Sequence, residues 1–274
     1  MPIDYEAEYN NRRRVPESGE IVARWLEQAE RARSSLACEL GIAYGPGPRH
    51  LYDLFPANGG GKTDPPLVVY IHGGYWQRGD RSEYSFVAEQ LVARGANVVL
   101  PSYSLCPHVS VAEITDEIRS FLVALWGRFQ RRPVIVGHSA GGHLAAEMIA
   151  TDWSKHAGVP ADLVRAGYAL SGVFELAPLI PTSLNEALGL TPDSARAASP
   201  LFGRVPLPGS NFVAGVGGAE SDEFLRQSRD LAAAWSGIKA ECVVVPGANH
   251  FTVVDELSRP GSAMIERILR LAQV

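Results

Sequence analysis

Short apolar runs alternate with amphipathic, helix-like segments along most of this chain. Each run is bounded by proline, glycine or polar residues, and such runs are typical of buried strands. The runs that we expect to be strands are 51–56, at an edge of the sheet, and 65–71, 97–101, 134–136, 166–174, 211–218 and 242–245. The segments between them predict helices at about 82–94, 111–129, 143–150, 224–228 and 252–272. This alternation predicts an α/β fold, in which helices cover both faces of a mostly parallel sheet.

Two segments lie outside the alternation. Residues 1–50 form an N-terminal extension with a helical pattern from about 7 to 36, and residues 175–207 form an insertion rich in Pro, Leu and Ser. Insertions at the carboxyl edge of such a sheet commonly shape the binding pocket, so both segments are candidates for a lid. The N-terminal helix has an alternative role, which is to cover an exposed sheet edge. We expect residues 1–274 to be one domain, because α/β folds reach this length as a single unit.

Composition and charge limit the kinds of partner that this chain can bind. A net charge of −5 and a pI near 5.8 give no electrostatic signal for nucleic acid or an anionic membrane. We expect the Arg12-Arg13-Arg14 run to be a solvated or salt-bridged surface and not a binding patch. No apolar stretch approaches the ~20 residues of a membrane span. The amino terminus lacks the basic and apolar regions of a secretory signal, so we expect a cytoplasmic protein. A small molecule is the expected partner. The oligomeric state stays open, with a homodimer as the default assembly.

The cysteines predict neither a disulfide nor a metal site. Cys38, Cys106 and Cys242 are widely separated and form no pair with metal-ligand spacing. We therefore expect three reduced thiols, no zinc and no other metal.

The segment 134–142 carries the first sign of chemistry. The β-branched run at 134–136 leads into Gly137-His138-Ser139-Ala140-Gly141, and a helix-like stretch follows at once. A nucleophilic serine on a sharp, strained strand-to-helix turn requires small residues two positions before and after it, which Gly137 and Gly141 provide. Ser139 is therefore a candidate nucleophile. The same pentapeptide also occurs in ordinary strand-to-helix turns, so on its own it leaves both interpretations open.

A second glycine pair follows an earlier strand. The run 65–71 leads into His72-Gly73-Gly74-Tyr75-Trp76, where backbone N–H groups can approach a ligand closely. We expect the N–H groups of Gly73, Gly74 and Ala140 to form an oxyanion hole, the last of these at the start of the helix after Ser139. The alternative is a Gly-Gly turn that binds nothing.

The base and the acid are expected from the last two strands. His250 follows the run 242–245 and a Pro-Gly turn, which places it at the carboxyl edge of the sheet where ligands gather. Glu220 lies in the turn after the 211–218 strand and is the expected acid, with Asp222 in reserve. Ser221 or Asp222 would then cap the following helix. The chain order Ser139, Glu220, His250 is that of α/β-hydrolases and not that of chymotrypsin or subtilisin.

With these residues in view, the chain resembles the kynurenine formamidase (arylformamidase) group of α/β-hydrolases, which is related to the hormone-sensitive-lipase-like esterases. The resemblance rests on 72–77, 137–141, the helix start at 223–228 and the run 246–251. It implies an α/β-hydrolase fold, the triad Ser139, Glu220 and His250, the oxyanion donors named above, and no cofactor. Members of the group often have aspartate at the acid position, and glutamate is competent in the same role.

The leading functional hypothesis is hydrolysis of an aryl formamide such as N-formylkynurenine, a step of tryptophan catabolism, through a formyl-enzyme. One alternative is a carboxylesterase for short acyl esters with the same triad. Another is a non-catalytic binding protein on a hydrolase scaffold. Tyr75, Trp76 and Phe251 flank the expected centre, where they either stack on an aromatic leaving group or pack in the core.

Overall fold

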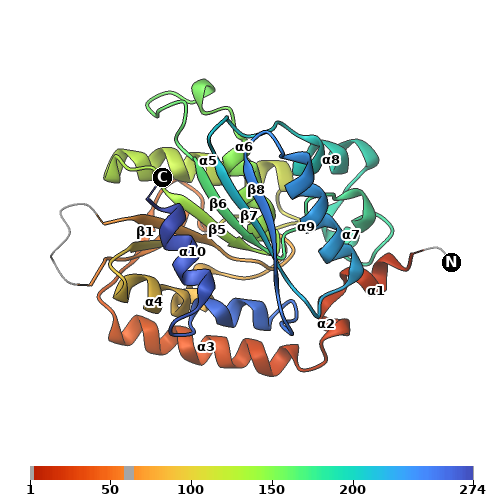
Figure 1. The fold of residues 1–274 in the computed structure, drawn as a ribbon, viewed down its shortest axis with the longest axis horizontal. Coiled ribbons are helices and arrows are strands. Elements are labelled where there is room, and N and C mark those ends of the chain that lie inside the picture. Colours follow the sequence, from red (N-terminus) through yellow and green to blue (C-terminus); the bar gives the residue numbers. More distant parts are fainter. Residues whose placement is uncertain (1–2, 59–64, 274) are drawn as a thin grey trace.

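The computed structural model describes residues 3–58 and 65–273, and within these ranges eight strands form one sheet in the order β1-β2-β4-β3-β5-β6-β7-β8 (Figure 1). The strands are β1 (Glu39–Ala43), β2 (Leu51–Phe55), β3 (Leu67–Ile71), β4 (Asn97–Pro101), β5 (Val134–His138), β6 (Ala166–Leu170), β7 (Asn211–Gly217) and β8 (Lys239–Val245). From β4 to β8 the neighbouring strands are parallel, whereas β1 and β2 are antiparallel to their neighbours. The expected α/β fold with a mostly parallel sheet is therefore confirmed.

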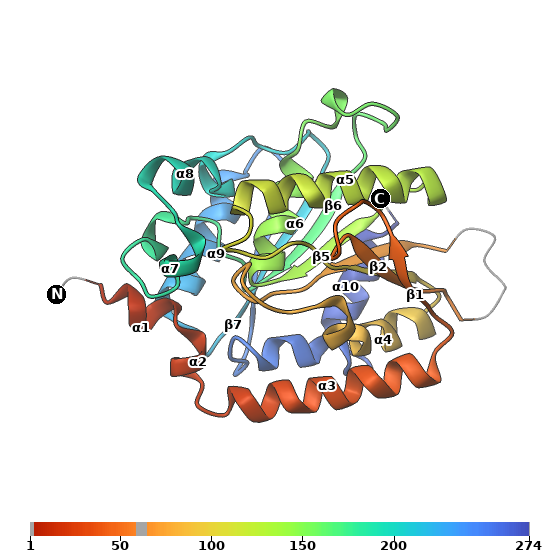
Figure 2. The ribbon, with the colours of Figure 1, turned by 180° about the vertical axis from the view of Figure 1, so that it is seen from behind.

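Helices lie on both faces of this sheet (Figures 1 and 2). The α-helices are α1 (Tyr5–Tyr9), α2 (Asn11–Arg14), α3 (Ser18–Ser35), α4 (Ala88–Ala93), α5 (Val111–Phe129), α6 (Ala140–Ala150), α7 (Asn185–Leu188), α8 (Pro192–Ala197), α9 (Asp222–Ala234) and α10 (Ala263–Leu271). The 3₁₀ helices are η1 (Arg81–Val87), η2 (Trp153–Lys155), η3 (Ala177–Leu179), η4 (Pro200–Phe202) and η5 (Thr252–Leu257). Both views show α5, α6 and α9 on one face of the sheet and α3, α4 and α10 on the other.

The uniformly apolar strands follow from this layering. Along β3, Leu67, Val69 and Ile71 pack into the core beneath α5 and α6, while Val68 and Tyr70 pack into the core on the opposite face. Successive side chains of a strand point to opposite faces, so a strand with helices on both sides needs apolar residues at every position. All five residues of β3 are buried, as this argument requires.

Four expected elements differ in their place in the sheet or in their boundaries. β2 is not an edge strand, because β1 pairs with it and forms the edge. The helix expected at 82–94 is the 3₁₀ helix η1 followed by the short α4, and the one expected at 252–272 is η5 followed by α10. The second break falls at Pro260-Gly261, since proline and glycine both disfavour a helix interior. β6 ends at Leu170 and not at 174, because Ser171 takes the left-handed φ of 50°.

The two segments outside the alternation pack against each other. Glu6 of α1 accepts hydrogen bonds of 2.8 Å from the backbone N–H and the hydroxyl of Ser183, which lies in the 175–207 insertion. α3 packs against η1, where the Trp25 ring lies 5.8 Å from that of Tyr84 and 6.0 Å from that of Phe86. The N-terminal segment thus contacts both the insertion and the loops beyond the sheet's carboxyl edge.

Candidate active site

Ser139 occupies a strained turn between β5 and α6. Its φ of 55° and ψ of −117° lie in a region that L-residues rarely adopt, and its side chain is almost fully buried. The flanking glycines are required by close backbone approach. A Cβ on Gly137 would lie 2.0 Å from the carbonyl oxygen of Gly141, and one on Gly141 would lie 2.0 Å from that of Ile71. The turn therefore has the geometry of a nucleophile elbow.

The loop after β3 lies beside this turn. A Cβ on Gly73 would lie 3.1 Å from Cβ of Ser139, and Gly74 has a φ of +118° with no space for a side chain. Neither the Gly73 nor the Gly74 N–H donates a hydrogen bond within the described ranges. Ala140 begins α6, where N–H groups of the first turn have no acceptor inside the helix. These three donors are thus available to a ligand near Ser139.

His72 fixes the backbone of the loop after β3. Its Nδ1 lies 2.8 Å from the Gly73 carbonyl oxygen, so this nitrogen carries the proton and donates. The ring stacks on Tyr103 at a centroid distance of 4.3 Å, and the Tyr103 hydroxyl donates to the His72 carbonyl. Complete burial lowers the pKa of His72 to about 4, so the ring is neutral. His72 therefore holds the backbone of this loop in place.

Glu220 and His250 meet at the carboxyl edge of the sheet. His250 Nδ1 lies 2.7 Å from Glu220 Oε2, and both side chains are buried. The other carboxylate oxygen, Oε1, accepts hydrogen bonds from the Ser171 hydroxyl at 2.5 Å and from the Gly217 N–H at 2.6 Å. Asp222 lies exposed in the first turn of α9, and Ser221 is the N-cap, so the reserve acid is away from His250.

His138 supports the histidine from the strand side. Its Nε2 lies 2.8 Å from the His250 carbonyl oxygen, and the two rings are 4.8 Å apart between centroids. Burial, reinforced by the neighbouring His250, holds the pKa of His138 well below its usual value. A neutral His138 that donates to this carbonyl fixes the backbone from which His250 projects.

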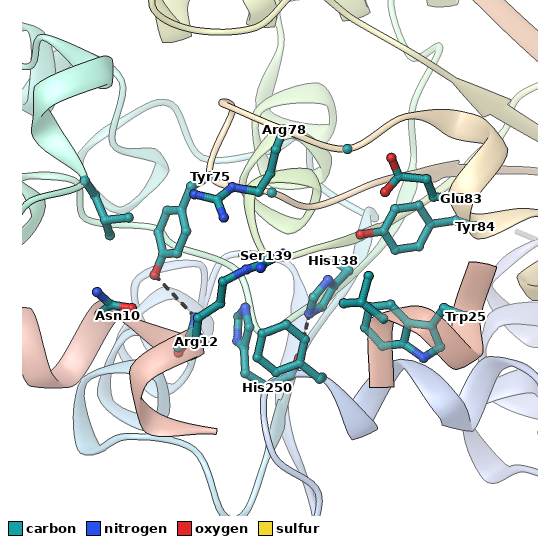
Figure 3. Close-up of a pocket in the computed structure, with 16 residues that line it drawn as sticks. Asn10, Arg12, Trp25, Tyr75, Arg78, Glu83, Tyr84, His138, Ser139 and His250 are labelled. Atoms are coloured by element: carbon teal, nitrogen blue, oxygen red, sulfur yellow. Dashed lines mark hydrogen bonds between the residues drawn. The ribbon is translucent and has the colours of Figure 1, made fainter. Parts of the chain in front are cut away.

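Ser139 and His250 line one cavity of about 260 Å³ (Figure 3). No hydrogen bond joins the two side chains among the described residues, and such contacts often tighten only when substrate is bound. Gly74, Tyr75 and Phe251 also line this cavity. Trp76 does not: it is fully buried and its ring contacts His143 edge-on, so it belongs to the core and not to the cavity wall.

Residues outside the motifs complete the cavity. Asn10, Asn11 and Arg12 of the N-terminal segment line it, together with Leu184 of the insertion and Arg78 of the loop after β3. The Tyr75 hydroxyl donates to the Tyr9 carbonyl at 2.5 Å and anchors that segment. Arg12, Arg13 and Arg14 are exposed, as expected for this run, and Arg12 also borders the cavity. No local pattern marks these residues, and neither does one mark Ser171, which positions Glu220.

The described part of the chain holds no group of three or more His, Cys, Asp or Glu side chains arranged to bind a metal. Cys38, Cys106 and Cys242 are free thiols. None of the helices in residues 3–58 and 65–273 has the length and apolar content to cross a membrane.

Comparison with known proteins agrees with this geometry. The sequence model of the family described as having the alpha/beta hydrolase fold matches residues 68–254. A kynurenine formamidase of Salmo salar is 33% identical over 240 residues, 84% of this chain and 81% of that protein. A kynurenine formamidase of Drosophila melanogaster is 30% identical over 248 residues, 85% of this chain and 81% of that protein.

A solved structure is also similar along almost the whole chain. This crystal structure, of a protein from Silicibacter sp. TM1040 provisionally assigned as a thioesterase, is 34% identical, with a TM-score of 0.88 over 98% of this chain and 100% of that one. The chain therefore belongs to the α/β-hydrolase family, as a member similar to the kynurenine formamidases.

Proposed function

We propose that this protein is a serine hydrolase that cleaves an aryl formamide such as N-formylkynurenine to formate and the arylamine. The observation that carries the mechanism is the 2.7 Å hydrogen bond between His250 and Glu220 at the cavity that Ser139 lines. The choice of an aryl formamide is supported by the relatives named kynurenine formamidase, which match more than four fifths of the chain.

The first half of the reaction acylates the serine. Glu220 accepts the Nδ1–H of His250, which leaves Nε2 unprotonated and able to take the proton of Ser139 Oγ. The oxygen then attacks the formyl carbon and forms a tetrahedral intermediate. The C–N bond breaks as protonated His250 gives its proton to the leaving nitrogen, and the formyl group stays on Ser139.

The developing oxyanion is stabilised by the N–H groups of Gly73, Gly74 and Ala140. They are fixed before substrate binds, because His72 holds the Gly73 carbonyl and α6 holds Ala140. Loss of one such donor typically costs about 10²–10³ in turnover. In the second half of the reaction His250 removes a proton from water, which attacks the formyl-enzyme and releases formate. The mechanism requires neither a metal nor an organic cofactor.

The cavity wall suits an aromatic leaving group. Trp25, Tyr84, Tyr75 and Phe251 line it, and the Trp25 ring lies 5.8 Å from Tyr84 and 6.1 Å from Phe251. Such rings offer faces and edges on which an arylamine can stack. Tyr75 and Phe251 thus keep the substrate-contacting role proposed for them, and Trp76 acts through packing.

The direct test is product release from N-formylkynurenine. We expect the wild-type protein to release formate and kynurenine in equal amounts, and Ser139→Ala to release neither while it stays folded by circular dichroism. Wild-type protein without turnover would overturn the assignment to aryl formamides. A Ser139→Ala variant with most of the wild-type rate would overturn the mechanism.

Hydrolysis of short acyl esters or thioesters is the second candidate. It is favoured by the 34% identical structure provisionally assigned as a thioesterase. The same serine, histidine and glutamate would serve it, because only the leaving group and the acyl substituent change.

A further inference from the structure

Arg49 hydrogen-bonds to two loops at the carboxyl edge of the sheet. It lies in the turn before β2, outside every motif described above. Its Nε donates to the carbonyl oxygen of Tyr103 at 2.7 Å, and its Nη2 donates to that of Gly79 at 2.6 Å. Tyr103 follows β4, whereas Gly79 belongs to the loop after β3. One guanidinium group thus connects the loop after β3 to the loop after β4.

Gly79 packs directly against the backbone that carries the expected oxyanion donors. Its φ is +94°, and a Cβ on Gly79 would lie 2.8 Å from the Gly73 carbonyl oxygen and 2.8 Å from His72 Nδ1. These two atoms are the partners of the hydrogen bond that fixes the Gly73 carbonyl. A shift of Gly79 would therefore displace Gly73, whose N–H is one of the expected donors.

Tyr103 gives Arg49 a second connection to the same backbone. The Tyr103 side chain is fully buried, its ring stacks on that of His72, and its hydroxyl donates to the His72 carbonyl at 2.9 Å. Tyr103 thus fixes both the ring and the carbonyl of His72. Arg49 supports the oxyanion loop by two routes, one through Gly79 and one through Tyr103.

The guanidinium group is matched to this role. Nε and Nη2 present N–H groups in a fixed planar fork, so one side chain holds two carbonyl oxygens at a set separation, which an ammonium cannot do. Because the donor is charged, these hydrogen bonds are stronger than those between neutral groups. Asp80 orients the group further, since its Oδ2 lies 3.5 Å from Nη2 and accepts from the Ser102 hydroxyl at 2.7 Å.

We propose that Arg49 is a positioning residue for the oxyanion hole. Through its two carbonyl contacts it keeps the Gly73 and Gly74 N–H groups where the oxyanion of the tetrahedral intermediate forms. Donors that are fixed before substrate binds need no reorganisation during the reaction, which is the source of their large effect on rate. The inference rests on the proposed mechanism at Ser139, but not on the choice of an aryl formamide as the substrate.

Arg49 acts on the hole and not on the substrate or the triad. It is not among the described residues that line the cavity. None of its hydrogen bonds within the described ranges reaches Glu220 or His250. Loss of Arg49 should therefore slow the chemical steps and leave both KM and the protonation of His250 unchanged.

The test is steady-state kinetics of Arg49→Met on p-nitrophenyl acetate and on N-formylkynurenine. Methionine keeps a long side chain but donates no hydrogen bond. We expect kcat to fall by about 10- to 100-fold with KM within about twofold of the wild-type value, because acylation and deacylation both pass through an oxyanion and slow together. Arg132→Met is the matched control, since Arg132 also donates to a backbone carbonyl, that of Asp162 at 3.1 Å, but does not line the cavity. It should keep the wild-type kinetics.

Two further readouts separate positioning from a general structural role. Inactivation by an alkyl fluorophosphonate, whose phosphoryl oxygen mimics the oxyanion, should slow by a similar factor in Arg49→Met. The acid limb of kcat/KM should stay at the wild-type pH, because His250 and Glu220 keep their hydrogen bond. An unchanged kcat, a loss that lies in KM, or a shifted acid limb would each overturn the proposal.

Arg49→Lys decides the matter if Arg49→Met fails to fold by circular dichroism. Lysine keeps the charge but lacks the planar fork, so we expect a fall in kcat with the same KM. Wild-type kcat in Arg49→Lys would overturn the proposal that the fork holds both loops.

Failure of the proposed function gives a different pattern. Wild-type protein that cleaves the ester but not the formamide overturns the aryl formamide assignment, and Arg49 is then judged on the ester and the fluorophosphonate. Wild-type protein that is inert toward all three compounds has no working oxyanion hole at Ser139, which overturns this inference together with the mechanism.

Discussion

His250 and Glu220 are joined by a hydrogen bond of 2.7 Å between Nδ1 and Oε2, although they follow different strands. The carboxylate is itself held by the Ser171 hydroxyl and the Gly217 N–H, both on Oε1. Its remaining oxygen is thus directed at the imidazole, and the tautomer that leaves Nε2 free is fixed before substrate arrives.

Replacement of this carboxylate tests its role. Glu220→Gln keeps the shape of the side chain but can donate to Nδ1 and favour the wrong tautomer, so we expect kcat to fall by about 10²–10⁴. The measurement is steady-state turnover at pH 7.5. Asp222→Asn, at an exposed position two residues further on, is the control and should keep the wild-type kcat. Equal effects of the two changes would contradict the assignment.

The glycines of the elbow provide a steric prediction. Gly137→Ala would bring a Cβ to 2.0 Å from the Gly141 carbonyl oxygen, so we expect insoluble protein or a loss of more than about 3 kcal/mol in the free energy of unfolding. Gly127→Ala lies within α5, where a Cβ meets no atom within 4 Å, and should stabilise by about 0.5–1 kcal/mol. Urea unfolding measures both. A well-folded Gly137→Ala protein would show that the close approach is not required.

The Tyr9 hydroxyl gives a prediction for the N-terminal segment. It is buried between Glu223 and Gln227, so Tyr9→Phe leaves both partners short of a hydrogen bond. We expect the free energy of unfolding to fall by about 1–3 kcal/mol. Tyr5→Phe, one helical turn earlier and without a hydrogen bond from its hydroxyl among the described residues, should change it by less than about 0.5 kcal/mol. Similar values for the two variants would mean that the buried hydroxyl contributes little.

Buried histidines predict a loss of stability in mild acid. Burial lowers the pKa of His72 and His143 to about 4 and that of His138 well below its usual value. Each takes up its proton near pH ~6.5 in the unfolded chain, so stability is complete above that pH and falls as the pH drops from there toward 4. From pH 7 to 5.5 we expect the three together to cost about 3–4 kcal/mol in the free energy of unfolding.

A single substitution separates this effect from other titrations. His143→Gln retains a donor for the Ala198 carbonyl, and the fall between pH 7 and 5.5 should shrink by about one third. His108→Gln, at an exposed position, should leave the fall unchanged. A fall that is as steep in His143→Gln as in the wild-type protein would argue against a neutral buried His143.

Elements with strong local signals were predictable from the sequence. α5 spans Val111–Phe129, the range expected from its apolar periodicity, because a capping box at Ser110 starts it and Gln130 in a left-handed conformation ends it. The sequence does not predict β1, since its five residues are exposed or half-buried and show no apolar alternation. Its pairing with β2 is a tertiary feature that no local pattern carries.

The site residues likewise divide into those that the sequence predicts and those that it does not. Ser139, Glu220 and His250 each follow the carboxyl end of a parallel strand, β5, β7 and β8, so strand order alone brings them to one edge. The position of Arg12 beside the cavity could not be predicted, because it depends on the contact between Tyr9 and Tyr75, residues distant in sequence. Trp76 lies beside a motif and was a candidate for substrate contact, but its side chain is buried in the core.

The central claim is tested most directly by steady-state kinetics on N-formylkynurenine and p-nitrophenyl acetate side by side, with Ser139→Ala as the blank. The proposed function predicts a much higher kcat/KM for the formamide and no turnover of either substrate in the variant. Efficient ester cleavage with little or no turnover of the formamide would contradict it, and would leave the serine, histidine and glutamate as those of a carboxylesterase.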